Sequence, residues 1–308
     1  MTLQLEPTPA IADSLADAVE TPGFWSRLVH QRFVRRFVHR KAAMVGLGFL
    51  VLIGLVAIFA PWIAPHDPDQ QNLTSTFLPP LSEGHLLGTD NLGRDTLSRL
   101  VSASRIAVVA SGETVLVALL LGVVPGMVAG YLRGRVDWVM SRVADAVQSL
   151  PPLILAIAIV AALGPGLRNA MLALGIIFAP NFFRLTRAAV LEVREETYIE
   201  ASRSIGTPIG RILLSRVTPN ILPVLLVQIS LVAGFALIAE ASLSLLGLGV
   251  QPPQASWGSM MGQGYNFLGL QPWLVVWPGL AISFTVLACN VVGDGLRDSI
   301  GKEIRVQR

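Results

Sequence analysis

Long apolar runs separated by short polar segments dominate this sequence. A helix needs roughly 20 apolar residues to cross the hydrocarbon core of a bilayer, and six runs reach about that length. We place these runs at residues 42–64, 106–132, 146–167, 169–188, 219–239 and 273–292. The pattern therefore predicts an all-α integral membrane protein with six transmembrane helices.

The polar segments between these runs differ in character. Residues 65–104 contain four prolines, which favours a structured loop over a helix. Residues 246–272 carry no charge and are rich in Gly, Pro and Gln, a composition compatible with a loop that dips back toward the bilayer. Residues 1–22 predict a disordered tail. In residues 32–40 the apolar and basic positions fall on opposite arcs, which predicts either an interfacial helix or a positive flank that only fixes topology.

The amount and placement of charge support a membrane location. Only 14% of the residues are charged, whereas soluble globular domains carry about 25%. Nineteen of the 23 Lys and Arg residues fall before the first run, after the second run, between residue 184 at the end of the fourth run and the start of the fifth, and in the C-terminal tail. Because positive charge marks the cytoplasmic side, we expect both termini to be cytoplasmic. The Arg residues lie between apolar runs rather than on one polar face, which argues against nucleic-acid binding.

The N-terminal segment and the cysteine and histidine content limit the chemistry further. We expect no cleavable signal peptide, because the first 40 residues contain Glu6, Asp13, Asp17 and Glu20 and lack an apolar core. The single cysteine, Cys289, excludes an intrachain disulfide. The four histidines are spread along the chain without the spacing of a metal site, so we expect no bound metal.

The stretch from Gly295 to Lys302 superficially resembles a phosphate-binding loop. Its spacing is one residue too long, Glu303 replaces the required Ser or Thr, and no strand precedes it. We therefore expect this chain to bind no nucleotide or other cofactor. The sequence also shows no catalytic triad and no paired-carboxylate site, so an enzyme is not predicted.

The longest predicted cytoplasmic loop has the features of two short helices. Residues 192–204 are good helix formers, and Gly206 is a natural terminator because glycine enters the left-handed cap conformation freely. We expect Thr207 to cap the next helix, with Pro208 in its first turn and Pro219 at its end. The result would be a short, stiff knob on the cytoplasmic side of the membrane.

This loop carries a recognisable motif. Glu200-Ala201-Ser202, followed after three residues by Gly206, resembles the EAA loop of ABC importer permeases. Ser202 stands where alanine is common, which is a small departure from the family pattern. The resemblance implies that Glu200, Ala201, Ser202 and Gly206 belong to a coupling helix that docks on an ATPase subunit and transmits its motion.

Three further stretches narrow the resemblance, and with the EAA loop they cover most of residues 61–300. They are HLLGTDNLGRDTLSRLVSASR at 85–105, ASLSLLGLGVQPPQASWG at 241–258 and NVVGDGLRDSI at 290–300. Each is similar to a segment of the second, C-type permease of dipeptide, oligopeptide and nickel importers. The family's usual Asp-Pro after the last stretch is missing, since Gly301 and Lys302 follow Ile300.

The resemblance implies a type I ABC importer permease fold in the bacterial inner membrane. The chain would form half of the transmembrane pathway for peptides, or for a related small solute such as a nickel complex, together with a second homologous permease and surrounding lipid. Two ATPase subunits would bind ATP and Mg²⁺, and a periplasmic or lipid-anchored binding protein would deliver the cargo. The chain itself would be a non-catalytic subunit.

The expected organisation has four parts. They are a cytoplasmic N-terminal tail at 1–41, the first transmembrane helix with its periplasmic loop at 42–104, the permease core at 105–295 with the coupling loop at 192–218, and a cytoplasmic tail at 296–308.

Charged residues near the predicted membrane surfaces have two interpretations each. Asp90, Arg94 and Asp95 either pair locally within an outer loop or contact a docked binding protein. Asp294, Arg297 and Asp298 are better explained as braces at the cytoplasmic end of the last helix than as contacts to ATP. Asp145 lies three residues from Arg142 and is expected to form an ion pair with it at the membrane interface.

Two acidic residues lie inside or at the edge of predicted spans. A charge at mid-bilayer costs roughly 2.5–3.5 kcal/mol, so such residues tend to face a cavity or a partner. Glu113 and Glu240 are therefore candidates for the pathway or its gate. Glu240 has the equal alternatives of capping a neighbouring helix or being protonated.

Two other classes of membrane protein fit the sequence less well. A secondary transporter or channel working without ATP often shows inverted repeats and broken helices, and we see no convincing internal repeat. A membrane-embedded enzyme would need paired catalytic groups within the membrane, and Glu113 and Glu240 have no obvious partners in the sequence.

Overall fold

The computed structural model describes residues 35–301. The expected disordered tail, the first three residues of the expected interfacial helix and the end of the C-terminal tail lie outside this range. Residues 35–38, which belong to the expected interfacial helix, are helical. The described residues contain no β-strand, only two isolated bridges. The all-α prediction is therefore confirmed.

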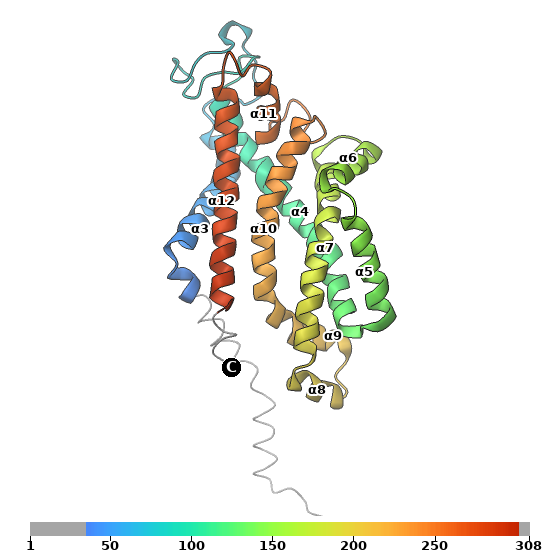
Figure 1. Cartoon of the computed structure of the whole chain (residues 1–308). Coiled ribbons are helices and arrows are strands. Elements are labelled where there is room, and N and C mark those ends of the chain that lie inside the picture. Colours follow the sequence, from blue (N-terminus) through green and yellow to red (C-terminus); the bar gives the residue numbers. More distant parts are fainter. Residues whose placement is uncertain (1–34, 302–308) are drawn as a thin grey trace, which may run out of the picture.

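Five long helices form the body of the molecule (Figure 1). They are α3 (Lys41–Ile63), α4 (Thr96–Leu132), α7 (Leu167–Arg194), α10 (Thr218–Leu245) and α12 (Trp273–Gly301). Each is long and apolar enough to cross a membrane. Five of the six predicted spans are thus confirmed, although α4 begins ten residues before the predicted residue 106.

The remaining predicted span, 146–167, is not one straight helix. The chain forms α5 (Gly134–Gln148) and α6 (Pro152–Leu163), which meet at an angle of 92°. Proline lacks an N–H and disfavours the α conformation in the residue before it, so Pro151-Pro152 ends one helix and begins the next. In Figure 1, α5 lies along the lower part of α7 and α6 near its upper end, so the pair makes one bent crossing.

The α4–α7 pair forms the centre of the fold through close backbone contact. Gly122, Gly126 and Gly130 recur at every fourth position of α4 and face α7. A Cβ atom on Gly126 would lie 2.8 Å from the carbonyl oxygen of Phe183, and one on Gly122 would lie 2.4 Å from that of Ala179. Small residues at this spacing allow membrane helices to approach closely.

The two ends of the molecule are built differently. One end, called the loop end here, carries residues 64–95 and α11 (Trp257–Tyr265). The other, called the α8 end, carries α8 (Thr197–Ser204) and α9 (Ile209–Ile212) (Figure 1). The start of α3 and the end of α12 also lie toward the α8 end. Both described chain ends are therefore on the same side of the helix bundle.

The predicted loop 246–272 is partly helical. Ser256 and Ser259 form a capping box at the start of α11, and the indole N–H of Trp257 donates to the carbonyl oxygen of Leu100 at 3.1 Å. These contacts pack α11 between the loop-end parts of α4, α10 and α12. The irregular backbone of this segment is thus held against protein, which is the condition under which irregular backbone is tolerated near the bilayer.

Most of the surface of α3 is apolar and exposed. Only 17% of the most apolar stretch of α3 is buried against other parts of the chain. The exposed large side chains include Val45, Val51, Leu52, Leu55, Ile58, Phe59, Trp62 and Ile63. In water such a surface would be unfavourable, so α3 requires lipid or another membrane chain as its neighbour.

Candidate functional site

The loop with the EAA-like motif forms a compact knob at the α8 end. Helix α8 ends in a hydrogen-bonded glycine cap: the N–H of Gly206 donates to Arg203 O at 2.9 Å, and the N–H of Thr207 donates to Ser202 O at 3.0 Å. Gly206 has φ +78°, a left-handed conformation that glycine adopts without strain. The predicted role of Gly206 as a terminator is confirmed.

Three local predictions about this loop are wrong. The helix expected over 192–204 is interrupted at Glu195 and Glu196, between α7 and α8. Thr207 is not the cap of the next helix, because Pro208 occupies that position without a side-chain hydrogen bond. Pro219 does not end a helix but lies in the first turn of α10.

A wider helical turn explains the error at Pro219. Residues Leu213–Val217 form a π-helical turn, η2, that joins α9 directly to α10. The side-chain hydroxyl of Thr218 also donates to Leu213 O at 2.9 Å. Proline is tolerated at the start of a helix, and here the wider turn lets the chain stay helical from residue 209 to 245.

The motif residues divide between two faces of α8. Ile199 and Ser202 are buried against the rest of the chain, and the Ser202 hydroxyl donates to Tyr198 O at 2.7 Å. Glu200 and Ala201 are exposed on the opposite face, and Gly206 is exposed at the helix end. The next residue outward, Ile205, is 78% exposed. The exposed part of α8 and its cap thus includes the small residues Ala201 and Gly206, the apolar Ile205 and the carboxylate of Glu200.

Tyr131 connects the knob to the transmembrane helices. It lies in the last turn of α4, and its hydroxyl accepts a hydrogen bond from Nε of Arg203 on α8 at 3.0 Å. The guanidinium carbons of Arg203 and Arg194 lie 4.8 and 5.7 Å from the centre of its ring. Arg194, at the end of α7, also donates to Tyr131 O. Cation–π contacts and hydrogen bonds thus join α4, α7 and α8 at one residue.

A second connection runs from the knob to α10. The side-chain amide of Asn220 donates to the hydroxyl of Tyr198 at 3.1 Å. Burial, followed by the negative charge of Glu196, raises the pKa of the Tyr198 hydroxyl above its usual value. The phenol therefore stays neutral at physiological pH. Together, the contacts of Tyr131 and Asn220 link α8 to three of the long helices, α4, α7 and α10.

Polar pairs hold the bent segment α5 to α7. Asp137 accepts hydrogen bonds from the guanidinium of Arg187, one of them at 2.7 Å, and Asp145 accepts from Arg184 at 2.8 Å. The predicted pair of Asp145 with Arg142 is confirmed at 3.6 Å. The pairs with Arg187 and Arg184 join α5 to α7, whereas the pair with Arg142 lies within α5.

At the loop end, the structure places Asp90 and Arg94 together. Arg94 Nε donates to Asp90 Oδ2 at 2.6 Å, and Asp90 Oδ2 also lies 3.7 Å from Nε of Arg99. Arg94 further donates to Gln263, in the last turn of α11, at 2.9 Å. The side chains of Asp90 and Arg94 are 12% and 5% exposed. Local pairing is therefore observed, while contact with a binding protein stays a prediction.

Asp95 lies beside these residues but has different partners. It caps α4, since its Oδ2 accepts from the backbone N–H and the hydroxyl of Ser98 at 2.8 and 2.6 Å. Its Oδ1 lies 2.9 Å from Nδ1 of His85, and Oδ2 lies 3.8 Å from Nδ1 of His66. The spacing of histidines along the sequence gave no sign of this cluster, because its members are well separated within the loop 64–95 and meet only through folding.

The two acidic residues of the predicted spans have contrasting surroundings. Glu240 is 3% exposed, accepts a hydrogen bond from Ser244 at 2.6 Å and has the hydroxyl of Ser256 as a second neighbour. Ser256 is the cap of α11, so Glu240 lies where α10 and α11 meet. Glu113 is half-buried on α4, and no described residue forms a hydrogen bond or ion pair with it. Their roles in the pathway or its gate stay predictions.

The end of α12 packs on the start of α3. Asp298 forms an ion pair with Arg40, and a Cβ atom on Gly295 would lie 2.4 Å from Cβ of Ala43. Asp294 and Arg297 are exposed, with no hydrogen bond or ion pair to the residues that the structure describes. Of the three residues predicted to stabilise the cytoplasmic end of the last helix, Asp298 is the one that forms an ion pair.

The chain matches known transport proteins over most of its length. Residues 122–306 match the family of binding-protein-dependent transport system inner membrane components. Residues 29–80 match the N-terminal transmembrane domain of oligopeptide transport permease C.

Several relatives align along nearly the whole chain. The di/tripeptide transport system permease protein DppC of Pseudomonas aeruginosa is 41% identical, covering 89% of this chain and 92% of that protein. The probable D,D-dipeptide transport system permease protein DdpC of Escherichia coli is also 41% identical, with 81% and 83% covered. The glutathione transport system permease protein GsiD of Pectobacterium atrosepticum is 36% identical, with 96% and 95% covered.

The fold also resembles a solved structure. A chain in an inward-facing structure of the MetNI methionine ABC transporter matches with a TM-score of 0.54 at 20% identity, covering 66% of this chain and 97% of that chain. This agreement confirms the predicted type I ABC importer permease fold. The chain belongs to the family of binding-protein-dependent transport system inner membrane components and is a permease subunit of an ABC importer.

Proposed function

We propose that this chain imports short peptides as half of a heterodimeric permease, driven by ATPase subunits that dock on α8. The observation that carries this proposal is the construction of the knob. Helix α8 and its cap expose Glu200, Ala201 and Ile205, while Arg203 and Tyr198 of α8 are hydrogen-bonded to Tyr131 of α4 and Asn220 of α10. A partner that moves α8 therefore moves transmembrane helices directly.

The names of the relatives support peptides as cargo. Di/tripeptides, D,D-dipeptides and glutathione, which is itself a tripeptide, are the solutes named for three of them. The related alternative of a nickel complex, expected from the sequence resemblance, has no such support among these relatives. Uptake assays with dipeptides and with Ni²⁺ distinguish the two.

The proposed assembly places each partner at a distinct surface. Two ATPase subunits would bind ATP and Mg²⁺ below α8 of this chain and its counterpart in the second permease. The exposed apolar faces of the long helices would meet that second permease and lipid. A periplasmic or lipid-anchored binding protein would dock at the loop end. In this arrangement the chain is non-catalytic, lies in the inner membrane and has both termini in the cytoplasm.

The geometry suggests how motion passes through the chain. Closure of the ATPases on ATP would draw the two knobs together. Because Tyr131 links α8 to the ends of α4 and α7, this movement would carry the closely packed α4–α7 pair as one unit. A rigid pair of helices turning against α10 and α12 would open the pathway alternately to the two sides.

Reconstitution in liposomes tests the proposal. The importer is purified as a complex from native membranes. Liposomes that contain it are expected to accumulate a labelled dipeptide only when ATP is on the side of the membrane that carries the ATPases and the binding protein is also present. The outcome that contradicts the proposal is dipeptide uptake by this chain alone under an ion gradient without ATP, which would favour a secondary transporter. Ni²⁺ uptake without dipeptide uptake would correct the cargo and leave the ATP-driven mechanism intact.

A further inference from the structure

We propose that His66, His85 and Asp95 bind one divalent first-row transition-metal ion, for which Zn²⁺ is the probe, at the loop end. One candidate ligand atom from each residue lies within 4.8 Å of the other two. Two imidazoles and a carboxylate form a ligand set suited to such ions. This site is separate from the transport function proposed above.

The separations between the ligand atoms suit a shared ion. His85 Nδ1 lies 2.9 Å from Asp95 Oδ1, and His66 Nδ1 lies 3.8 Å from Asp95 Oδ2. With metal–ligand bonds of about 2.0–2.1 Å, two ligand atoms of a tetrahedral ion lie about 3.3 Å apart. The His85–Asp95 separation is that of a direct hydrogen bond, which a bound ion would replace, and the His66–Asp95 separation is somewhat longer than this value. The imidazole rings are also neighbours, with centroids 4.9 Å apart.

The charges around Asp95 leave room for a cation. Its side chain is only 1% exposed, and within residues 35–301 no Lys or Arg forms an ion pair with it. Asp90 nearby differs, because Arg94 and Arg99 surround its carboxylate. Hydrogen bonds from Ser98 and His85 stabilise the Asp95 carboxylate, and a metal ion between Asp95 and the imidazoles would in addition compensate its charge.

A serine outside the ligand set positions two of the ligands. The hydroxyl of Ser98 accepts a hydrogen bond from the backbone N–H of His66 at 3.0 Å and donates to Asp95 Oδ2 at 2.6 Å. This arrangement holds the backbone of His66 beside Asp95. The side chain of His66 is 41% exposed and has space to turn toward the ion. Such supporting hydrogen bonds are typical of metal sites.

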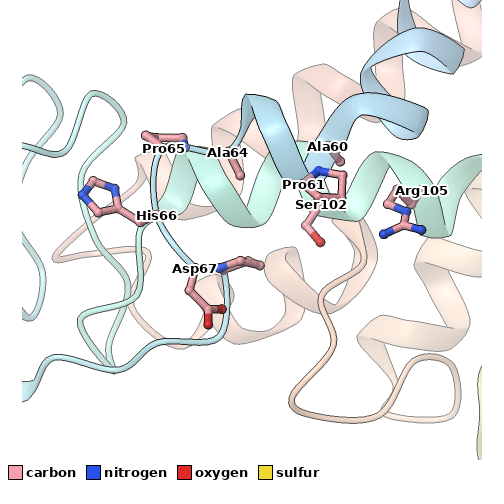
Figure 2. A pocket seen from close by; sticks show the side chains of 9 residues that line it. Ala60, Pro61, Ala64, Pro65, His66, Asp67, Ser102 and Arg105 are labelled. Atoms are coloured by element: carbon pink, nitrogen blue, oxygen red, sulfur yellow. The ribbon is translucent and has the colours of Figure 1, made fainter.

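A surface pocket adjoins the cluster at His66, which is one of the residues that line it. The pocket has a volume of about 420 Å³ and lies between the end of α3 and the first turns of α4. Figure 2 shows His66 at one end of this pocket, with its ring turned away from Arg105 at the other end. An ion can therefore approach the imidazole without passing the positive charge of Arg105. Once bound, it would fasten the segment after α3 to the start of α4.

A metal-binding titration tests the site. The full chain, purified in detergent through a tag without histidine and stripped with a chelator, is titrated with Zn²⁺ against a chromophoric competitor. We expect one tightly bound ion per chain. The double variant His66→Ala/His85→Ala should bind at least about 10-fold more weakly, since even supporting residues of metal sites contribute 10–100-fold.

Two further variants guard against trivial results. His39→Ala removes a histidine just before α3, at the end opposite the cluster. The His39 ring is hydrogen-bonded to the carbonyl oxygen of Arg35, and this variant should bind Zn²⁺ like the unmodified chain. Asp95→Asn keeps an oxygen that can cap α4 but removes the negative charge, so it should fold and bind more weakly.

Two physical signatures complete the test. X-ray absorption of the bound ion should show two imidazole ligands, and Zn²⁺ should raise the unfolding temperature of the unmodified chain but not of the double variant. Equal affinity in the double variant, or no tight binding by the unmodified chain, would overturn the proposal. Neither result would affect the proposed peptide transport, in which the ion takes no part.

Discussion

At the scale of single residues, Tyr131 is the point where the knob meets the transmembrane helices. Tyr131→Phe removes the hydroxyl that Arg203 contacts but keeps the ring that both guanidinium groups contact. We expect the importer to assemble normally. The packing of the knob on α4 should be less stable by about 1 kcal/mol. Uptake per ATP hydrolysed, measured in liposomes, should therefore fall.

The control for this variant is Tyr265→Phe. Tyr265 is 68% exposed at the loop end, so the same chemical change should leave coupling unaltered. If both variants transport like the unmodified importer, Tyr131 does not carry the motion of α8.

Gly206 and Gly210 offer a matched pair for the glycine cap. A Cβ atom on either residue would meet open space, but only Gly206 has a positive φ. Gly206→Ala should destabilise the end of α8 by about 1–2 kcal/mol, because alanine is strained in the left-handed conformation. We expect weaker peptide-stimulated ATP hydrolysis for Gly206→Ala and unchanged hydrolysis for Gly210→Ala. Equal rates in the two variants would contradict a coupling role for this cap.

At the scale of helices, the close approach of α4 and α7 should determine stability. Gly126→Ala would place Cβ 2.8 Å from Phe183 O and 2.9 Å from Cβ of Thr186, so the helices must move apart. Overpacking of this kind costs about 1–3 kcal/mol. Gly112→Ala on the same helix meets nothing within 4 Å and serves as the control. Thermal unfolding in detergent should show a lower midpoint for Gly126→Ala alone.

The helices that the sequence predicted well are those with uninterrupted apolar runs. Helices α3 and α12 begin within one residue of their predicted positions. The failures have local causes that hydropathy cannot register. Pro151-Pro152 bends the third span, whereas Pro219 is absorbed by a π-helical turn. A proline's effect thus depends on the hydrogen bonds around it, which the sequence does not display.

The candidate site was predictable only where its residues are contiguous. The motif around Glu200 and the terminator Gly206 are local features, and the sequence located both. The contacts of Tyr131 with Arg203, and of His66 with Asp95, join residues brought together by folding. No periodicity or motif marks such pairs, so the structure was needed to find them.

At the scale of the whole molecule, the two ends have different partners in this account. The α8 end presents an exposed knob that is hydrogen-bonded to the long helices through Arg203 and Tyr198. The loop end presents paired polar residues that hold α11 and the start of α4 together. An importer requires this asymmetry, because energy and cargo arrive from opposite sides of the membrane.

Site-specific photo-crosslinking in native membranes tests this assignment most directly. A photoreactive residue is placed at Ile205, which is 78% exposed on the knob, and separately at Leu81, which is 83% exposed at the loop end. We predict that position 205 crosslinks to a P-loop ATPase and that position 81 crosslinks to a substrate-binding protein. An ATPase captured from position 81, or none from position 205, would contradict the account.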